Sequence, residues 1–341
     1  MPAHSSFAAP LVLTMGEPAG VGGELACLAW HRRATADAPF FVIDDADRLD
    51  TLSRELALGA PVRAISSPAE AVRVWPDALP VLSRPLARAV RPGHPDTANA
   101  PMVIAAIDEA VEFALAGDVA GVVTNPIQKA VLYAAGFQLP GHTEYLAELT
   151  GTTSPPVMLL TAPGLRVALV TIHLSLARAV ASLTEEAIVE TARIVAAGLQ
   201  RDFGIDAPRL AVAALNPHAG EAGAIGREEI DIIEPAIATL RRDGIAASGP
   251  YPADTMFHAD ARTHYDAAIC MYHDQALIPL KTIDFWRGVN VTLGLPIVRT
   301  SPDHGTALDL AGTGKANPES LLAALRTARD MASHRRTGIA A

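Results

Sequence analysis

The sequence predicts an α/β protein in which mostly parallel β-sheet is flanked by helices on both faces. Short apolar runs alternate with longer amphipathic segments along the whole chain, which is the pattern of successive strand–helix units. Of the 341 residues, 50% are hydrophobic and 19% are charged, a composition typical of globular proteins. Internal repeats and low-complexity linkers are absent from the sequence, so these units are expected to pack intimately, in two domains at this length.

The individual elements follow from hydrophobic period and length. Short apolar runs predict nine strands, at residues 11–15, 40–43, 80–82, 121–124, 157–160, 167–172, 210–215, 267–271 and 289–293. Amphipathic segments predict helices between them, the clearest at residues 97–115, 185–199, 228–242 and 319–332. Functional side chains in such sheets collect beyond the carboxyl ends of the strands.

Charge and cysteine content exclude several functional classes. The formal net charge is −10, which disfavours sequence-independent nucleic-acid binding because that needs a basic face. Cys27 and Cys270 lie in apolar surroundings and form no CxxC pair, so we expect core residues and a reducing cytoplasm. We see no signal peptide, and no apolar run reaches the ~18–20 residues of a membrane span. The sequence therefore predicts a cytoplasmic protein without nucleic-acid or membrane partners.

Three histidines each follow a different predicted strand. His173 comes after VALVTI, His218 after AVAALNP and His273 after AAICMY. Three imidazoles with an open fourth position form a catalytic site for zinc or a similar divalent ion, whereas core or active-site histidines without metal are the alternative. Asp274 and Asp254 are candidates for an outer shell or a further ligand, or for helix caps.

Two glycine-rich loops are candidate ligand contacts. Residues 16–24, GEPAGVGGE, follow the first strand and open a helix, which suits either a bound anion or a plain tight turn. The spacing is not GxGxxG, so Asp44 and Asp45 are not expected to bind a ribose as in a Rossmann fold. Residues 303–318, DHGTALDLAGTGKANP, precede a helix and favour contact with a cofactor.

Cations and polar groups suited to an anion recur near predicted strand ends. Arg offers a forked donor and Lys a point charge for phosphate or carboxylate, although each can equally be a surface cation. Arg299 is expected to end an apolar strand at 294–298, where a surface charge is less expected. The candidates are Lys129, His142, Thr143, Lys281, Asn290 and Arg299.

At these residues the chain resembles the 4-hydroxythreonine-4-phosphate dehydrogenase family over nearly its whole length. The shared motifs include GEPAGVGGE, TNPIQK, GHTEYLAELTG, TIHLSL, LNPHAGEAGAIGREE, GPYPADTMF, MYHDQALIPLK and FWRGVNVTLGLPIVRTSPDHGTALDLAGTGKA. Long polar motifs in one order are more specific than any single site.

The resemblance implies a fold and a set of site residues. It implies an isocitrate/isopropylmalate dehydrogenase-like fold with its active site in the interdomain cleft, residues 1–130 and 305–341 forming the nucleotide-binding domain and 131–304 the metal, substrate and dimerisation domain. It implies a homodimer with the active site at the subunit interface. The implied metal ligands are His173, His218 and His273. The implied substrate contacts are His142, Thr143, Lys281, Asn290 and Arg299, and the implied cofactor contacts are His304, Gly305, Thr306 and Asn317.

The implied reaction is the NAD- or NADP-dependent oxidation of 4-phosphohydroxy-L-threonine in pyridoxine 5′-phosphate biosynthesis. The product, 2-amino-3-oxo-4-phosphooxybutanoate, loses CO₂ to give 3-amino-2-oxopropyl phosphate. Lys281 and Asp254 are the candidate general bases. Imidazole ligands favour zinc, with magnesium or cobalt as alternatives.

Two loops depart from the family pattern. Glu17 stands where an Asp is more frequent and Gly23 where a Pro is more frequent, and Asn125 and Gln128 replace a frequent Gly and His. These departures keep open a related branch that oxidises threonate or erythronate 4-phosphate. A metal-dependent hydrolase of a phosphorylated small molecule is the alternative from another class. The 303–318 loop disfavours it, because that loop predicts contact with a cofactor that a hydrolase does not need.

Overall fold

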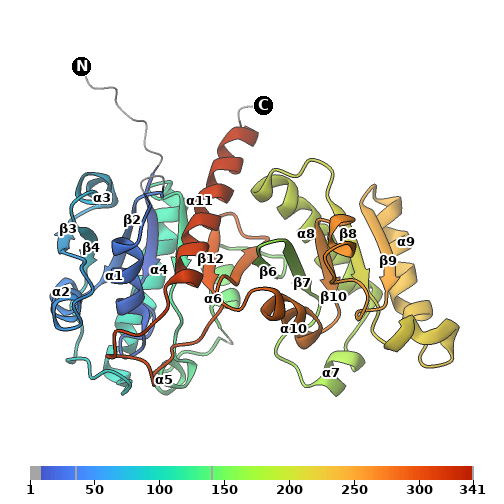
Figure 1. Ribbon diagram of the computed structural model, residues 1–341, viewed down its shortest axis with the longest axis horizontal. Helices are drawn as coiled ribbons and strands as arrows, with labels where there is room; N and C mark the ends of the chain where they lie inside the picture. The colour runs from blue at the N-terminus through green and yellow to red at the C-terminus, as the bar shows by residue number, and fades with distance from the viewer. Residues whose placement is uncertain (1–8, 35–36, 140, 340–341) are drawn as a thin grey trace. The chain divides into compact units, whose positions relative to one another are not determined.

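The computed structural model describes residues 9–34, 37–139 and 141–339, and these form an α/β protein with mainly parallel sheet, as predicted (Figure 1). The chain divides into two compact units. The first unit comprises residues 1–153 and 295–332, and the second comprises 154–294 and 333–341. The chain thus changes unit at 153/154, 294/295 and 332/333, whereas the sequence-based division placed changes at 130/131 and 304/305. Within the described ranges, no helix is long and apolar enough to cross a bilayer.

The sheet of the first unit is wholly parallel, in the order β3-β4-β2-β1-β5-β12. β1 lies inside this sheet with both faces covered, and all four of its residues are buried. Buried strands of this kind read as continuous apolar runs rather than alternating ones, which is why the sequence reveals them. The strands are β1 (Leu11–Thr14), β2 (Phe40–Asp44), β3 (Val62–Ile65), β4 (Leu79–Ser83), β5 (Gly121–Thr124) and β12 (Arg299–Pro302).

Helices of the first unit pack their apolar stripes on this sheet. α4 contributes Val103, Ile107 and Val111 to a core shared with Val12, Phe41 and other strand residues. α4 ends at Gly117, which takes a left-handed conformation with φ 80°. The helices are α1 (Gly22–His31), α2 (Ala46–Glu55), α3 (Pro68–Val74), η1 (Thr97–Asn99), α4 (Ala100–Ala116), α5 (Lys129–Ala134), α6 (His142–Leu149) and α11 (Glu319–Ile339).

The sheet of the second unit is mixed, in the order β11-β6-β7-β10-β8-β9. β6 runs antiparallel to both β11 and β7, while β7, β10, β8 and β9 are parallel. The carboxyl ends of β7, β10 and β8 therefore lie at one edge. The strands are β6 (Val157–Ala162), β7 (Leu165–Leu169), β8 (Arg209–Ala213), β9 (Ala246–Tyr251), β10 (Ala267–Cys270) and β11 (Val289–Leu293).

Two helices account for much of the core of the second unit. α10 buries Ala276 and Leu280 with β-strand residues such as Val167 and Cys270. α8 begins at Thr184, whose hydroxyl accepts from Ala187 N, and ends at the left-handed Gly204. The helices are α7 (Leu176–Ala181), α8 (Glu185–Phe203), η2 (Pro217–Gly223), η3 (Glu229–Ile233), α9 (Glu234–Arg242), η4 (Ala261–Thr263) and α10 (His273–Ile283).

All nine predicted strands are present, but one prediction near the candidate site is wrong. Residues 294–298 form no strand, and Arg299 begins β12 instead of ending a strand before it. Gly294 takes a φ of 91°, which breaks extended structure at the start of that segment. β3 and β9 were not predicted, because they carry few strongly apolar residues.

Candidate active site

The three candidate metal ligands follow three adjacent parallel strands of the second unit. His173 lies between β7 and α7, His218 lies in η2 after β8, and His273 is the first residue of α10 after β10. Since β10 pairs with both β7 and β8, the three histidines leave the same edge of one sheet, as the sequence predicted.

Two of these histidines approach each other. The ring centroids of His173 and His273 are 6.1 Å apart. Two imidazoles on one zinc ion, with Zn–N bonds of about 2.0–2.1 Å, place their ring centres about 5 Å apart, so this pair fits a shared divalent ion after a small adjustment. Among the residues that the structure describes, no group of three His, Cys, Asp or Glu side chains is gathered closely enough to hold a metal.

Asp274 contacts His273 directly. Its Oδ1 lies 2.7 Å from His273 Nδ1, so this contact engages Nδ1 and Nε2 is the other ring nitrogen. The helix cap considered for Asp274 is wrong, because α10 starts at His273 and Tyr272 is its N-cap residue. Asp254 lies in a turn after β9 and caps no helix either. The two aspartates line one open pocket of about 400 Å³ within the second unit, together with Tyr272, Gln275 and Ile278.

A buried cation marks the anion-binding candidates of the first unit. Arg299 is 3% exposed, and its Nη2 donates to Thr124 Oγ1 over 2.7 Å at the carboxyl end of β5. Burial lowers the pKa of Arg299 to about 10, so the guanidinium stays charged at neutral pH. A buried charge of this kind favours an anionic ligand.

His142 and Thr143 open α6 in the same unit, as predicted. Burial, followed by the charges of Arg299 and Lys129, holds the pKa of His142 well below its usual range. His142 is therefore neutral at pH 7, and its buried Nε2 has no hydrogen-bond partner within the described residues. Thr143 is 9% exposed. An unsatisfied buried nitrogen beside two cations suits a ligand oxygen.

The other two substrate candidates belong to the second unit. Asn290 lies on β11, and its Oδ1 is also buried without a hydrogen-bond partner among the residues described. Lys281 lies near the end of α10, and its Nζ is 5.4 Å from the ring centre of Phe285. The predicted substrate residues therefore come from both units.

The 303–318 loop is irregular along its length and is anchored at several points in the first unit. Thr306 O accepts from Val21 N over 3.0 Å, and Gly20 leaves no room there for a side chain. Buried Glu24 accepts from the backbone N–H groups of Gly312 and Gly314. Among the remaining cofactor candidates, Asn317 Oδ1 accepts from Glu319 N at the start of α11. His304 Nδ1 lies 2.8 Å from Gly305 O. A Cβ at Gly305 would meet no atom within 4 Å.

Comparisons with known proteins give the family. Residues 36–328 match the model for the pyridoxal phosphate biosynthetic protein PdxA. The chain belongs to the PdxA family. It is 56% identical to a 4-hydroxythreonine-4-phosphate dehydrogenase of Caulobacter vibrioides over 96% of this chain and 98% of that one, and 55% identical to one of Bradyrhizobium diazoefficiens over the same shares. A crystal structure of 4-hydroxythreonine-4-phosphate dehydrogenase from Klebsiella pneumoniae matches with a TM-score of 0.84 and 40% identity over 95% of this chain and all of that one.

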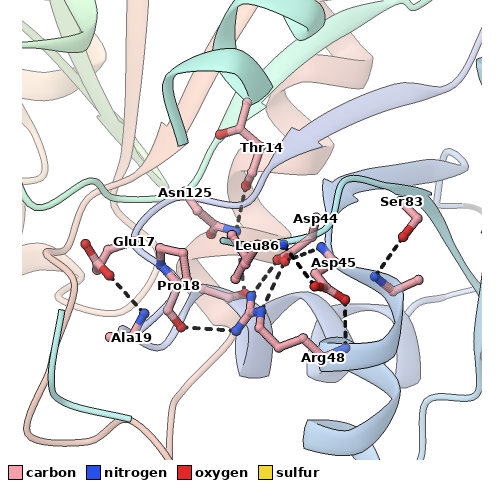
Figure 2. Close-up of polar contacts among 12 residues, drawn as sticks. Thr14, Glu17, Pro18, Ala19, Asp44, Asp45, Arg48, Ser83, Leu86 and Asn125 are labelled. Atoms are coloured by element: carbon pink, nitrogen blue, oxygen red, sulfur yellow. Dashed lines mark hydrogen bonds and ion pairs between the residues drawn. The ribbon is translucent and has the colours of Figure 1, made fainter. Parts of the chain in front are cut away.

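In this PdxA-family chain Asp44, the last residue of β2, and Asp45, which follows it, bond to the protein itself. Asp44 forms a two-bond ion pair with Arg48, whose Nη1 also donates to Pro18 O, and Asp45 caps α2 by accepting from Arg48 N (Figure 2). Asp45 also accepts from Leu86 N. These bonds tie the first glycine loop to α2 and occupy both carboxylates.

The two departures in the first unit meet at the end of β5. Asn125 is fully buried and donates to Thr14 O over 3.1 Å (Figure 2). A side chain at Gly16 would collide with Asn125, so this loop is built around the asparagine. Glu17 accepts from Ala19 N, and burial raises the pKa of its carboxyl group.

Sequence reasoning missed several residues of the site because their partners are distant in the chain. Thr124, the partner of Arg299, and Glu24, the anchor of the glycine loop, are examples. Glu24 ends the motif GEPAGVGGE, so a charged residue inside an otherwise apolar first helix was the available signal.

Proposed function

We propose that this protein catalyses the NAD- or NADP-dependent oxidation of 4-phosphohydroxy-L-threonine to 2-amino-3-oxo-4-phosphooxybutanoate. Loss of CO₂ then gives 3-amino-2-oxopropyl phosphate in pyridoxine 5′-phosphate biosynthesis. Relatives more than 50% identical over nearly the whole chain carry the matching name. The observation that carries the proposal is the pair of Arg299 and His142. Arg299 is buried, and its positive charge helps to lower the pKa of His142, whose buried Nε2 has no hydrogen-bond partner among the described residues.

In this proposal the phosphate is bound by Arg299, His142 and Thr143. Arg299 supplies a forked donor, Thr143 a hydroxyl, and neutral His142 donates from Nε2 when its other ring nitrogen is unprotonated. Lys281 and Asn290 bind further polar groups of the substrate. Asn290 Oδ1 is an acceptor, so it suits the ammonium or hydroxyl group better than the phosphate.

We assign the divalent ion to His173, His218 and His273. Asp274 orients His273 through its 2.7 Å contact with Nδ1. A bound ion supplies Lewis acidity that lowers the pKa of the substrate hydroxyl. Zinc is the first choice for imidazole ligands, and cobalt or magnesium are alternatives.

Lys281 and Asp254 are the proposed general bases. Asp254 lines the same 400 Å³ pocket as Asp274, the residue next to His273, which supports a place close to the reacting hydroxyl. Lys281 follows on the same helix as His273. Either group would accept the hydroxyl proton while the carbon that bears this hydroxyl gives its hydride to NAD⁺ or NADP⁺, leaving the ketone and the reduced cofactor.

The nicotinamide cofactor is assigned to the glycine loop, through His304, Gly305, Thr306 and Asn317. The open space at Gly305 and the anchoring of the loop by Glu24 support this assignment, since a nucleotide needs close approach to a fixed backbone. Residues 1–130 with 305–341 would then serve the nucleotide, and 131–304 the metal and most of the substrate.

We further propose a homodimer in which the partner subunit completes the active site. Large apolar side chains of the second unit are exposed, and such side chains are typical of subunit interfaces. They are Leu174, Leu176, Ile225, Tyr251, Ile278, Phe285 and Trp286. Mixing inactive His218→Ala and His273→Ala subunits tests this, because a site that takes these two ligands from different subunits would be intact once in the mixed dimer and would recover activity.

The test of the reaction is the formation of reduced cofactor from NAD⁺ and NADP⁺. We expect 4-phosphohydroxy-L-threonine to react with the highest kcat/KM, ahead of threonate and erythronate 4-phosphates. A preference for a sugar-acid phosphate would move the protein to that branch. Phosphate release without cofactor reduction would instead indicate the metal-dependent hydrolase.

A further inference from the structure

His218 lies in an unusual backbone segment directly after β8. Five consecutive residues, 218–222, take left-handed conformations, with φ of 53°, 52°, 77°, 47° and 54°. Only Gly220 among them adopts this region without a steric penalty. Four non-glycine residues in a left-handed turn persist only where the surrounding structure enforces it.

A buried carboxylate lies at the centre of that surrounding structure. Glu229 is 2% exposed and is the first residue of the short π-helical segment η3. Its Oε1 accepts from Leu215 N over 2.8 Å and from Asn216 N over 2.7 Å, and both amides lie between β8 and the turn. π-helical turns are rare and occur frequently at functional sites.

The second oxygen of Glu229 fixes the turn from the other side. Oε2 accepts from Asn216 Nδ2 over 2.9 Å, and it would lie 2.6 Å from a side-chain carbon at Gly220. Gly226 packs against the same Asn216 side chain. A Cβ at Gly226 would lie only 2.2 Å from Asn216 Nδ2. Glu229 therefore contacts both the entrance and the middle of the left-handed turn, on either side of His218.

We propose that Glu229 is the positioning residue for His218. It acts through the backbone: the carboxylate binds the amides of residues 215 and 216 and lies against residue 220, and the left-handed turn so fixed aims the imidazole. The inference rests on the proposed role of His218 as a metal ligand. It adds a residue that touches neither substrate nor metal and yet sets the affinity for the metal.

The test is Co²⁺ binding to the metal-free full-length protein, followed by its visible absorption spectrum. Glu229→Gln keeps the side-chain shape but turns an N–H donor toward Asn216 Nδ2. We expect the Co²⁺ Kd to rise about 10- to 100-fold, the usual effect of disturbing the groups that orient a metal ligand. The matched control is Glu234→Gln, which makes the same charge change at an exposed position of α9 and should leave the Kd unchanged.

A glycine pair gives a second, independent variant. Gly220→Ala places a methyl group against Glu229 Oε2, whereas Gly244→Ala has a similar φ, 82° against 77°, and open space around the new carbon. Both variants strain the backbone, so the difference between them reports the packing of residue 220 against Glu229 Oε2 and Gly226 O, at 2.6 and 2.9 Å from the new carbon. We expect weaker Co²⁺ binding only for Gly220→Ala.

The outcomes separate the two proposals. If His218→Ala weakens Co²⁺ binding but Glu229→Gln and Gly220→Ala lower only the Tm, Glu229 is a structural brace and the positioning role is overturned. If His218→Ala binds Co²⁺ as tightly as the unaltered protein, the ligand role of His218 fails first, and the positioning role fails with it. Weaker binding in all three, with both controls unchanged, supports the inference.

Discussion

The carboxyl edges of the two sheets hold their candidate site residues in different ways. In the first unit Arg299 is 3% exposed and bonded to Thr124, and Glu24 fixes the glycine loop. In the second unit the side chain of His273 is 38% exposed and that of Asp274 71%, and His173 and His218 both have positive φ. The anion and nucleotide candidates are thus fixed by the folded chain itself. The histidine edge is held by strained backbone, and a metal ion would add the missing constraint.

The largest effect is expected at the histidine edge. His273→Ala removes a proposed metal ligand, and kcat/KM should fall by roughly a thousandfold or more, since a bound ion contributes several kcal/mol to catalysis. Steady-state kinetics and metal content check this. His264→Ala is the control, an exposed histidine of the same unit that should leave both unchanged. Normal turnover in His273→Ala would remove it from the metal site.

At the anion candidates, we expect substrate binding to depend on the forked shape of the arginine side chain and not on its charge alone. Arg299→Lys keeps the positive charge but loses the fork that binds phosphate and Thr124, so the KM for the phosphorylated substrate should rise about 100-fold. The KM for NAD⁺ should stay nearly constant. Arg326→Lys, in an ion pair with Asp37 at part-exposed positions, is the control. Equal rises in both KM values would take Arg299 out of the phosphate site.

A smaller effect is expected at the anchor of the glycine loop. Glu24→Gln leaves one of the Gly312 and Gly314 N–H groups without its charged acceptor, at a cost of about 1–2 kcal/mol. The KM for NAD⁺ should therefore rise about tenfold, with the substrate KM unchanged. Glu55→Gln, the same charge change at the exposed last residue of α2, is the control. A change confined to the substrate KM would contradict the assignment of this loop to the nucleotide.

The smallest effect concerns the pH dependence of stability. The pKa of folded His142 is lowered, so the unfolded chain takes up a proton first as the pH falls below about 6.5. Stability should then decrease with falling pH, with a contribution of at most about 1.4 kcal/mol per pH unit from this group. Denaturant unfolding gives the free energy of unfolding at each pH between 7 and 5. This free energy should fall less steeply with decreasing pH in His142→Asn than in the unaltered protein or in His264→Asn. Identical slopes would mean that His142 is not buried in its neutral form.

Local pattern predicts more of the fold than of the site. Continuous apolar runs identified buried strands such as β1 and β5, and topology then placed His173, His218 and His273 at one edge. The start of β12 was missed, because the apolar residues 294–298 precede the strand. Burial and positive φ are set by tertiary contacts: the left-handed turn at His218 depends on Glu229, 11 residues further along the chain.

One measurement tests the contrast between the two edges most directly: cofactor reduction with 4-phosphohydroxy-L-threonine after chelator treatment, followed by addition of Zn²⁺, Co²⁺ or Mg²⁺. We predict that chelation abolishes the reaction, that a divalent ion restores it, and that binding of the phosphorylated substrate to the Arg299 edge survives in part without metal. Full activity of the metal-free protein would contradict the account.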